Sequence, residues 1–261
     1  MREVPACRGR MHWPVDAFTI TAFIYRPEFP MSKILALDTS TDACSAALLL
    51  DGQLLKRFKV EPRRHTHLLL PMVDELLQEA GVALKSLDAI AFGRGPGSFA
   101  GIRIATGAAQ GLALAAGLPV IPVSTLECIA TEHLLVSGAA DMHLLTALDA
   151  RMDEVYWCAW EACDGKLSRL TPERVGAPAD MQVDGLDSGF AALGSGWRYA
   201  DGMPAELVAA AADPLIELYP NAATMALIAA EAFARGETVV PDEVQPVYLR
   251  DQVAWKKKDQ Q

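Results

Sequence analysis

Two short segments carry residue types that bind phosphate groups in other proteins. The first, Asp38-Thr39-Ser40-Thr41, lies between the apolar runs KILAL and ACSAALLL. In a tight turn, hydroxyl and backbone N–H groups form an anion nest, and a carboxylate holds a metal-bound water. The same residue types also satisfy the backbone of an ordinary turn. The spacing therefore leaves open both a nucleotide loop and a purely structural turn.

The second segment, Gly93–Ser98 (GRGPGS), precedes a predicted helix from Phe99 to Ala116. Backbone N–H groups at a helix N-terminus attract anions. However, the segment lacks the lysine of a P-loop, and Ser98 replaces the third glycine of a dinucleotide-binding turn. Pro96 also removes one backbone donor. The segment alone gives little support to a nucleotide site.

No group of side chains forms a recognisable catalytic or metal-binding set. His65 and His67 are two residues apart, a spacing that does not share a helical face, and the remaining three histidines are scattered. The chain contains neither H-E-x-x-H nor G-x-S-x-G. We therefore expect no catalytic residue and no metal site.

The elements around these segments repeat along the chain. Strand Lys33–Asp38, a polar turn, a second strand and an Asp51-Gly52 hairpin recur as strand Leu144–Asp149, a turn, a strand and Asp164-Gly165. The offsets are similar, 149 − 38 = 111 and 164 − 51 = 113. A repeated unit of this kind indicates duplicated lobes. We predict an α/β protein with a first lobe over 31–138 and a second over 139–261.

Residues 1–30 have no strand or helix period and contain four prolines. We interpret them as an N-terminal extension or a start codon assigned too far upstream.

Two helices of the first lobe have apolar faces. Leu69, Met72, Val73, Leu76, Leu77 and Ala80 form one stripe at helical spacing, and Phe99–Ala116 is rich in Ala and Gly. An exposed apolar patch of this kind would suit a protein partner. Burial inside the lobe explains the same pattern, so both interpretations remain open.

Composition limits the function classes. The formal net charge of −10 argues against a free-standing nucleic-acid binder. Five cysteines without C-x-x-C spacing indicate reduced thiols in a reducing compartment, and no apolar run approaches the roughly 20 residues of a membrane span. We expect a cytoplasmic protein.

Four stretches resemble the TsaB (YeaZ) family: LALDTST, RHTHLLLPMVDELL, GRGPGSFAGIRIATGAAQGLA and PVSTLECIA. The resemblance implies the actin-like ATPase (ASKHA) superfold, with two duplicated lobes that each contain a mixed sheet and packed helices. It also implies an accessory role in forming N6-threonylcarbamoyladenosine (t6A) at position 37 of tRNAs that read ANN codons. Members of the family are non-catalytic paralogues of the transferase subunit TsaD.

The resemblance further implies the partners. These are TsaD in a heterodimer, TsaE, a pathway link to TsaC, and a second copy of the chain when TsaD is absent. Contact with tRNA and use of ATP would belong mainly to partner subunits, so no cofactor is expected.

The resemblance places the TsaD contact on the helices over about 66–80 and 98–116. The residues expected to make it are Leu69, Met72, Val73, Leu76, Gly101, Ile102, Ala105, Ala108, Ala109 and Leu112. A bulky charge at Ala105 or Ala109 would then abolish binding and leave the monomer folded. Asp38, Thr39, Ser40 and Thr41 would be a vestigial nucleotide loop.

Thr125 and Ile129 occupy the places of the two histidines that bind metal in TsaD. Neither side chain is a metal ligand of the usual kinds. The alternative function is an active ATP-binding or ATP-hydrolysing enzyme of the same superfold that uses Asp38 and the loop after it.

Overall fold

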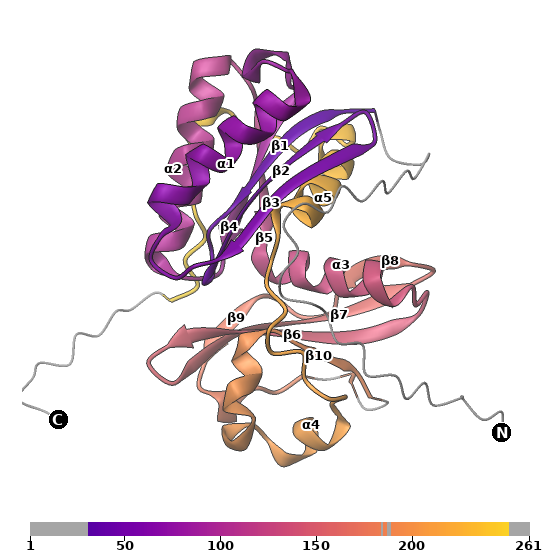
Figure 1. Ribbon diagram of the computed structural model, residues 1–261. Coiled ribbons are helices and arrows are strands. Elements are labelled where there is room, and N and C mark those ends of the chain that lie inside the picture. The colour runs from indigo at the N-terminus through magenta and orange to yellow at the C-terminus, as the bar shows by residue number, and fades with distance from the viewer. Residues whose placement is uncertain (1–30, 184, 187–188, 251–261) are drawn as a thin grey trace, which may run out of the picture.

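The computed structural model describes residues 31–183, 185–186 and 189–250, which form two lobes (Figure 1). The first lobe has a mixed five-stranded sheet in the order β3-β2-β1-β4-β5. β1 is antiparallel to β2 and parallel to β4. The bounds are β1 (Lys33–Asp38), β2 (Ala43–Leu50), β3 (Gln53–Val60), β4 (Ala89–Gly95) and β5 (Val120–Ser124).

The sheet of the second lobe repeats this topology. Its strand order is β10-β6-β7-β8, and β9 pairs with β7. β6 is antiparallel to β7 and parallel to β10, as β1 is to β2 and β4. The bounds are β6 (Met142–Arg151), β7 (Glu154–Cys163), β8 (Lys166–Arg169), β9 (Arg174–Gly176) and β10 (Ala191–Leu193). The predicted duplication and the actin-like α/β fold are confirmed.

The hairpins form where the sequence predicts them. Asp51 and Gly52 have φ of 47° and 87°, and Asp164 and Gly165 have φ of 51° and 74°. Two consecutive left-handed residues are what a two-residue type I′ turn requires, and Asp-Gly adopts that conformation readily. These turns fix the register of β2–β3 and β7–β8.

Helices cover both faces of the first sheet. α1 (His65–Ala80) and α2 (Phe99–Ala116) lie on one face and α5 (Ala222–Ala234) on the other (Figure 1). Because both faces are covered, β1 and β2 are buried along nearly their whole length and read as continuous apolar runs. Two layers of core result, one on each side of the sheet.

The position of α5 corrects the predicted lobe boundary. α5 lies within the range 139–261 assigned to the second lobe, yet it packs on β1, β2, β4 and β5. Val239 then bridges Val120, and Val244 enters the core beneath α1 and α2. The cause is composition, because the nearly all-apolar α5 needs burial and the second face of the first sheet is available.

α3 (Thr125–Ser137) lies between the lobes (Figure 1). Leu126, Ile129, Ala130 and Leu134 pack on the second sheet, whereas Cys128 belongs to the core of the first lobe. The Ser124 side chain caps the N-terminus of α3, because its Oγ accepts a hydrogen bond from the Glu127 N–H at 3.2 Å. On the far face of the second sheet lie Trp197 of the 3-10 segment η3 (Ser195–Gly202) and the short helix α4 (Ala205–Ala210).

α2 is 18 residues long with a mean hydropathy of 1.2, which by length and composition alone is enough to cross a membrane. A search of the sequence for a long apolar run misses this helix. Six of its residues are buried within the first lobe, as expected of a helix that packs on a sheet. Residues 1–30, which we interpret as an extension or a start codon assigned too far upstream, and the tail after Arg250 lie outside the described residues.

Candidate functional site

Asp38 ends β1 and is completely buried. Its Oδ1 accepts hydrogen bonds from the Ser40 N–H at 3.2 Å and the Ser40 hydroxyl at 3.0 Å. Its Oδ2 is also buried and has no hydrogen-bond partner. Burial raises the pKa of Asp38 to about 7, against the lowering effect of the Ser40 hydrogen bonds. The carboxyl group is therefore enclosed in the core and only partly ionised at neutral pH.

The N-terminus of α2 packs directly against the loop after Asp38. The Ser98 N–H donates to the Ser40 carbonyl at 2.7 Å, and the Thr39 hydroxyl donates to the Gly101 carbonyl at 2.6 Å. A Cβ atom at Gly97 would lie 2.4 Å from the Ser40 carbonyl oxygen, and one at Gly101 would lie 1.9 Å from that of Thr39. These glycines are required by contact between two backbones. The loop after Asp38 and the start of α2 are therefore in direct backbone contact.

Gly93 on β4 has a similar role, because a Cβ atom there would lie 2.0 Å from Asp38 Oδ2. Thr41, at the end of the loop, is only half-buried, and both Ser40 and Thr41 line the space between the lobes.

That space is a cleft of about 830 Å³. Thr41 and Asp42 line it from the first lobe, and Asp149 and Arg151 line it from the equivalent turn of the second. Arg151 Nη1 lies 2.9 Å from Asp149 Oδ2, and Arg151 Nη2 lies 3.9 Å from Asp42 Oδ1. Arg151 therefore offsets part of the negative charge that Asp149 and Asp42 bring to the cleft.

At the mouth of the cleft, Arg103 of α2 contacts aromatic rings. Its guanidinium carbon lies 3.9 Å from the centroid of Phe99, and its Nε donates to the Tyr248 hydroxyl at 2.7 Å. Sequence reasoning missed this cluster, because Tyr248 is 145 residues from Arg103 and no local pattern links them.

Thr125 and Ile129 are both completely buried at the start of α3. The Thr125 hydroxyl has no hydrogen-bond partner. Among residues 31–183, 185–186 and 189–250, no group of three histidine, cysteine or acidic side chains is placed to hold a metal ion.

The stripe expected to contact a partner lies mostly inside the lobe, which corrects the residue assignment. Eight of its ten residues are buried: Leu69, Met72, Val73, Leu76, Gly101, Ile102, Ala105 and Ala109. Ala108 and Leu112 are half-buried and also pack on that core. An apolar stripe at helical spacing is the face that packs on the sheet, so these side chains are not free for a partner.

The opposite face of α2 is exposed and almost without charge. It comprises Phe99, Ala100, Arg103, Gly107, Gly111, Leu114 and Ala115, and Leu70 of α1 is exposed as well. Phe99, Leu114 and Leu70 are 59%, 54% and 52% exposed. A Cβ atom at Gly107 or Gly111 would have no atom within 4 Å. These two helix-interior glycines therefore have no packing reason within the described chain.

Comparison with known proteins identifies the family. The family model for TsaD, tRNA N6-adenosine threonylcarbamoyltransferase, matches residues 59–258. The tRNA threonylcarbamoyladenosine biosynthesis protein TsaB of Escherichia coli (strain K12) is 41% identical over 232 residues, covering 86% of this chain and 97% of that protein. The TsaB protein of Haemophilus influenzae is 38% identical over 236 residues, covering 86% and 96%.

A solved structure agrees with these sequences. YeaZ from Pseudomonas aeruginosa superposes with a TM-score of 0.76 at 44% identity, covering 84% of this chain and 100% of that one. The repeated sheets, the Asp38 loop joined to the start of α2, and these relatives together show that the chain belongs to the TsaB (YeaZ) family of tRNA threonylcarbamoyladenosine biosynthesis proteins.

Proposed function

We propose that this chain is an accessory subunit without chemistry of its own, which supports t6A formation at position 37 of tRNAs reading ANN codons by binding TsaD. The contact surface is the outer face of α1 and α2, defined as Leu70, Phe99, Ala100, Gly107, Gly111, Leu114 and Ala115. The observation that carries the proposal is the outward orientation of Gly107 and Gly111, with open space above both. The contact is thereby moved from the buried stripe to the opposite side of the same helices.

The two exposed glycines would allow the backbone of a partner helix to approach the backbone of α2. Glycines one turn apart on an exposed face let a second helix come close, so that the main chains make extensive van der Waals contact. Leu70, Phe99 and Leu114 supply large apolar side chains around this flat strip. A charge-poor patch rimmed by polar residues is typical of protein interaction sites.

The TsaD match favours TsaD as the partner. It covers residues 59–258 and so includes α1 and α2. Equivalent helices on the partner would allow two similar faces to pair about an approximate twofold axis. The same geometry gives a homodimer when TsaD is absent.

The enclosure of Asp38 supports a role without catalysis. A carboxylate that acts on a nucleotide and its metal ion must reach them in its charged form. Asp38 has no exposed atom, and the N-terminus of α2 closes its loop. The cleft leaves room for the alternative, an ATPase of the same superfold, and purified protein that hydrolyses ATP, with loss of turnover in Asp38→Asn, would support that alternative.

The remaining partners follow from the pathway. We infer a cytoplasmic complex in which TsaE joins TsaD and this chain, and TsaC supplies the activated intermediate. With a formal net charge of −10, tRNA contact belongs mainly to the partners.

The test is copurification of tagged TsaD with Gly107→Glu, Gly111→Glu and the double variant. Glutamate is a better helix former than glycine, so the monomer should remain folded, while a charge in the centre of the contact should abolish retention by TsaD. Ala209→Glu, at an exposed position of α4 on the other lobe, is the matched control and should bind normally. Retention of the folded double variant at the wild-type level would refute this contact surface.

Function is tested by reconstitution of TsaC, TsaD, TsaE and tRNA with or without this protein. We expect t6A formation only in its presence, and loss of t6A with the double variant. Formation of t6A at the same rate without this chain would refute the accessory role.

A further inference from the structure

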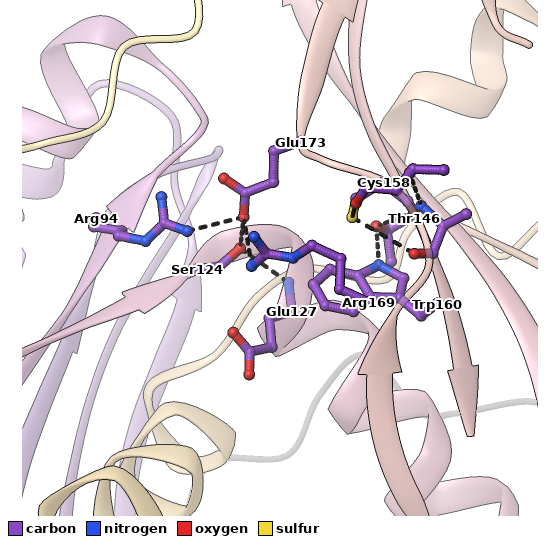
Figure 2. Close-up of polar contacts among 10 residues, drawn as sticks. Arg94, Ser124, Glu127, Thr146, Cys158, Trp160, Arg169 and Glu173 are labelled. Carbon is purple, nitrogen blue, oxygen red and sulfur yellow. Dashed lines mark hydrogen bonds and ion pairs between the residues drawn. The ribbon is translucent and has the colours of Figure 1, made fainter. Parts of the chain in front are cut away.

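Glu173 is a nearly buried carboxylate of the second lobe that reaches the first lobe. It lies between the ends of β8 and β9, and its side chain is 5% exposed. Its Oε1 accepts a hydrogen bond from Arg94 Nη2 at 3.0 Å and another from the Ser124 hydroxyl. Arg94 belongs to β4 and Ser124 ends β5, so both donors come from the first sheet. Figure 2 shows Arg94 and Ser124 both directed at one carboxylate oxygen of Glu173.

The site around Glu173 is more than a single ion pair. Ser124 also caps α3, so Glu173 lies at the N-terminal end of that helix, where a negative charge is favourable. Arg169, in the same lobe as Glu173, lies 3.5 Å from the same oxygen. Hydrogen bonds to a buried carboxylate from charged donors are stronger than those between neutral groups. The carboxylate is therefore well stabilised where it is and costly to leave unpaired.

The location of the cluster gives it a mechanical consequence. α3 packs on both lobes. If the angle between the lobes changed, they would therefore rotate about this helix. Arg94 and Glu173 belong to different lobes, so a change in this angle would act on the hydrogen bond between them. A second connection lies nearby, where the Val247 N–H donates to the Arg94 carbonyl at 2.8 Å and Arg250 pairs with Glu154 of β7.

We propose that Arg94 and Glu173 form a tie that fixes the angle between the two lobes, so that the chain behaves as one rigid body and the width of the cleft does not depend on a bound ligand. The tie is a property of the isolated chain and does not rest on binding to TsaD. Glu173 could instead have a role within its own lobe, such as holding the β8–β9 connection. Only the tie between the lobes requires Arg94. Arg169, which is in the same lobe, would serve the structural role equally well.

The test is pulsed electron–electron resonance between spin labels on the two lobes of the full-length chain. Cys163 is an exposed native cysteine on the second lobe, while Cys44, Cys128 and Cys158 are buried. Gln53→Cys places the second label at the exposed start of β3, away from the outer face of α1 and α2. Cys7→Ser removes the remaining thiol, and dilution with unlabelled protein suppresses distances between molecules.

We expect a narrow distance distribution in this background. Arg94→Met and Glu173→Gln should each roughly double its width, since either change releases the lobes to rotate about α3. Arg169→Met, which removes a guanidinium from within one lobe, should leave the width unchanged. Glu161→Gln, which removes an exposed carboxylate of β7 that pairs with His143 in the same lobe, should also have no effect.

Near-ultraviolet circular dichroism verifies that each variant is folded. If Glu173→Gln does not fold, Arg94→Met decides, because its change lies in the other lobe and leaves the β8–β9 connection intact. A wild-type width in folded Arg94→Met would overturn the proposal. Equal broadening by Arg169→Met and Arg94→Met would also overturn it, since that result would assign Glu173 to its own lobe.

Discussion

Gly107 and Gly111 lie in the interior of α2 and point into open space. Replacing both by alanine adds two methyl groups that meet no atom of the described chain. Because alanine restricts the backbone of the unfolded chain more than glycine does, the free energy of unfolding of the isolated chain should rise. The same methyl groups would stand between α2 and the main chain of a partner helix, so binding to TsaD should weaken. Stability and binding are therefore expected to change in opposite directions.

The size of the stability change follows from helix propensity. Glycine costs about 0.8–1.0 kcal/mol relative to alanine at an exposed position inside a helix, so the pair should stabilise the chain by nearly 2 kcal/mol. Neither methyl group has a neighbour within 4 Å to clash with. For a chain of this size, about 1 kcal/mol corresponds to 2–4 °C in Tm, and we expect an increase of roughly 4–8 °C.

The assay is urea unfolding of the isolated chain, followed by circular dichroism at protein concentrations low enough to prevent self-association. Binding to TsaD is measured separately by titration calorimetry. Gly101→Ala in the same helix is the matched control. Its methyl group would lie 1.9 Å from the Thr39 carbonyl oxygen, so this variant should lose stability.

Two results would contradict this prediction. Loss of stability in Gly107→Ala/Gly111→Ala would mean that the glycines serve a contact within the monomer. Unchanged affinity for TsaD, together with the expected gain in stability, would mean that the outer face of α2 does not approach the partner closely.

Further outcomes follow from burial. The pKa of Asp38 is raised from 3.8 to about 7, so the folded state binds more protons than the unfolded state between these values. Stability should fall as pH rises through that window, by up to about 4 kcal/mol. Asp38→Asn should remove this dependence in urea unfolding at pH 5 and 8, and an equal pH dependence in both proteins would contradict the assignment. Ala105→Glu places a carboxylate at a completely buried position and should cost more than about 3 kcal/mol. Circular dichroism should then show an unfolded or strongly destabilised chain, and a stable variant that merely fails to bind TsaD would restore the original stripe as the contact. Ser124→Ala removes both the cap of α3 and a donor to Glu173 and should cost about 1–3 kcal/mol. A Tm within 1 °C of the wild type would show that neither contact contributes roughly this much.

Local sequence patterns predict much of the fold. The strand patterns and the Asp-Gly turns predicted the two hairpins and the duplication. A two-residue hairpin can be predicted because it depends on the conformations of two adjacent residues. The stripe from Leu69 to Ala80 predicted α1, and the helix predicted from Phe99 to Ala116 has the bounds of α2. The quoted stretches were specific enough to identify the family.

The direction of each helix face depended on the tertiary structure. An apolar stripe indicates that one face of a helix is buried, but it does not say what covers that face. In α2 the distinction was harder, because small residues occupy both the packed face with Ala105 and the open face with Gly107. Sequence reasoning therefore assigned the partner contact to side chains of α1 and α2 that are mostly buried in the structure.

Two lobes, their strands and turns, and the family could all be predicted from local sequence, since each of these depends on residues close together in the chain. Three features could be found only in the folded chain: α5 returns to the first sheet, the start of α2 closes the loop after Asp38, and Glu173 meets Arg94 across 79 residues. These features arise from contacts between distant segments. No periodicity records such contacts, because burial and close approach are fixed only when the whole chain has packed.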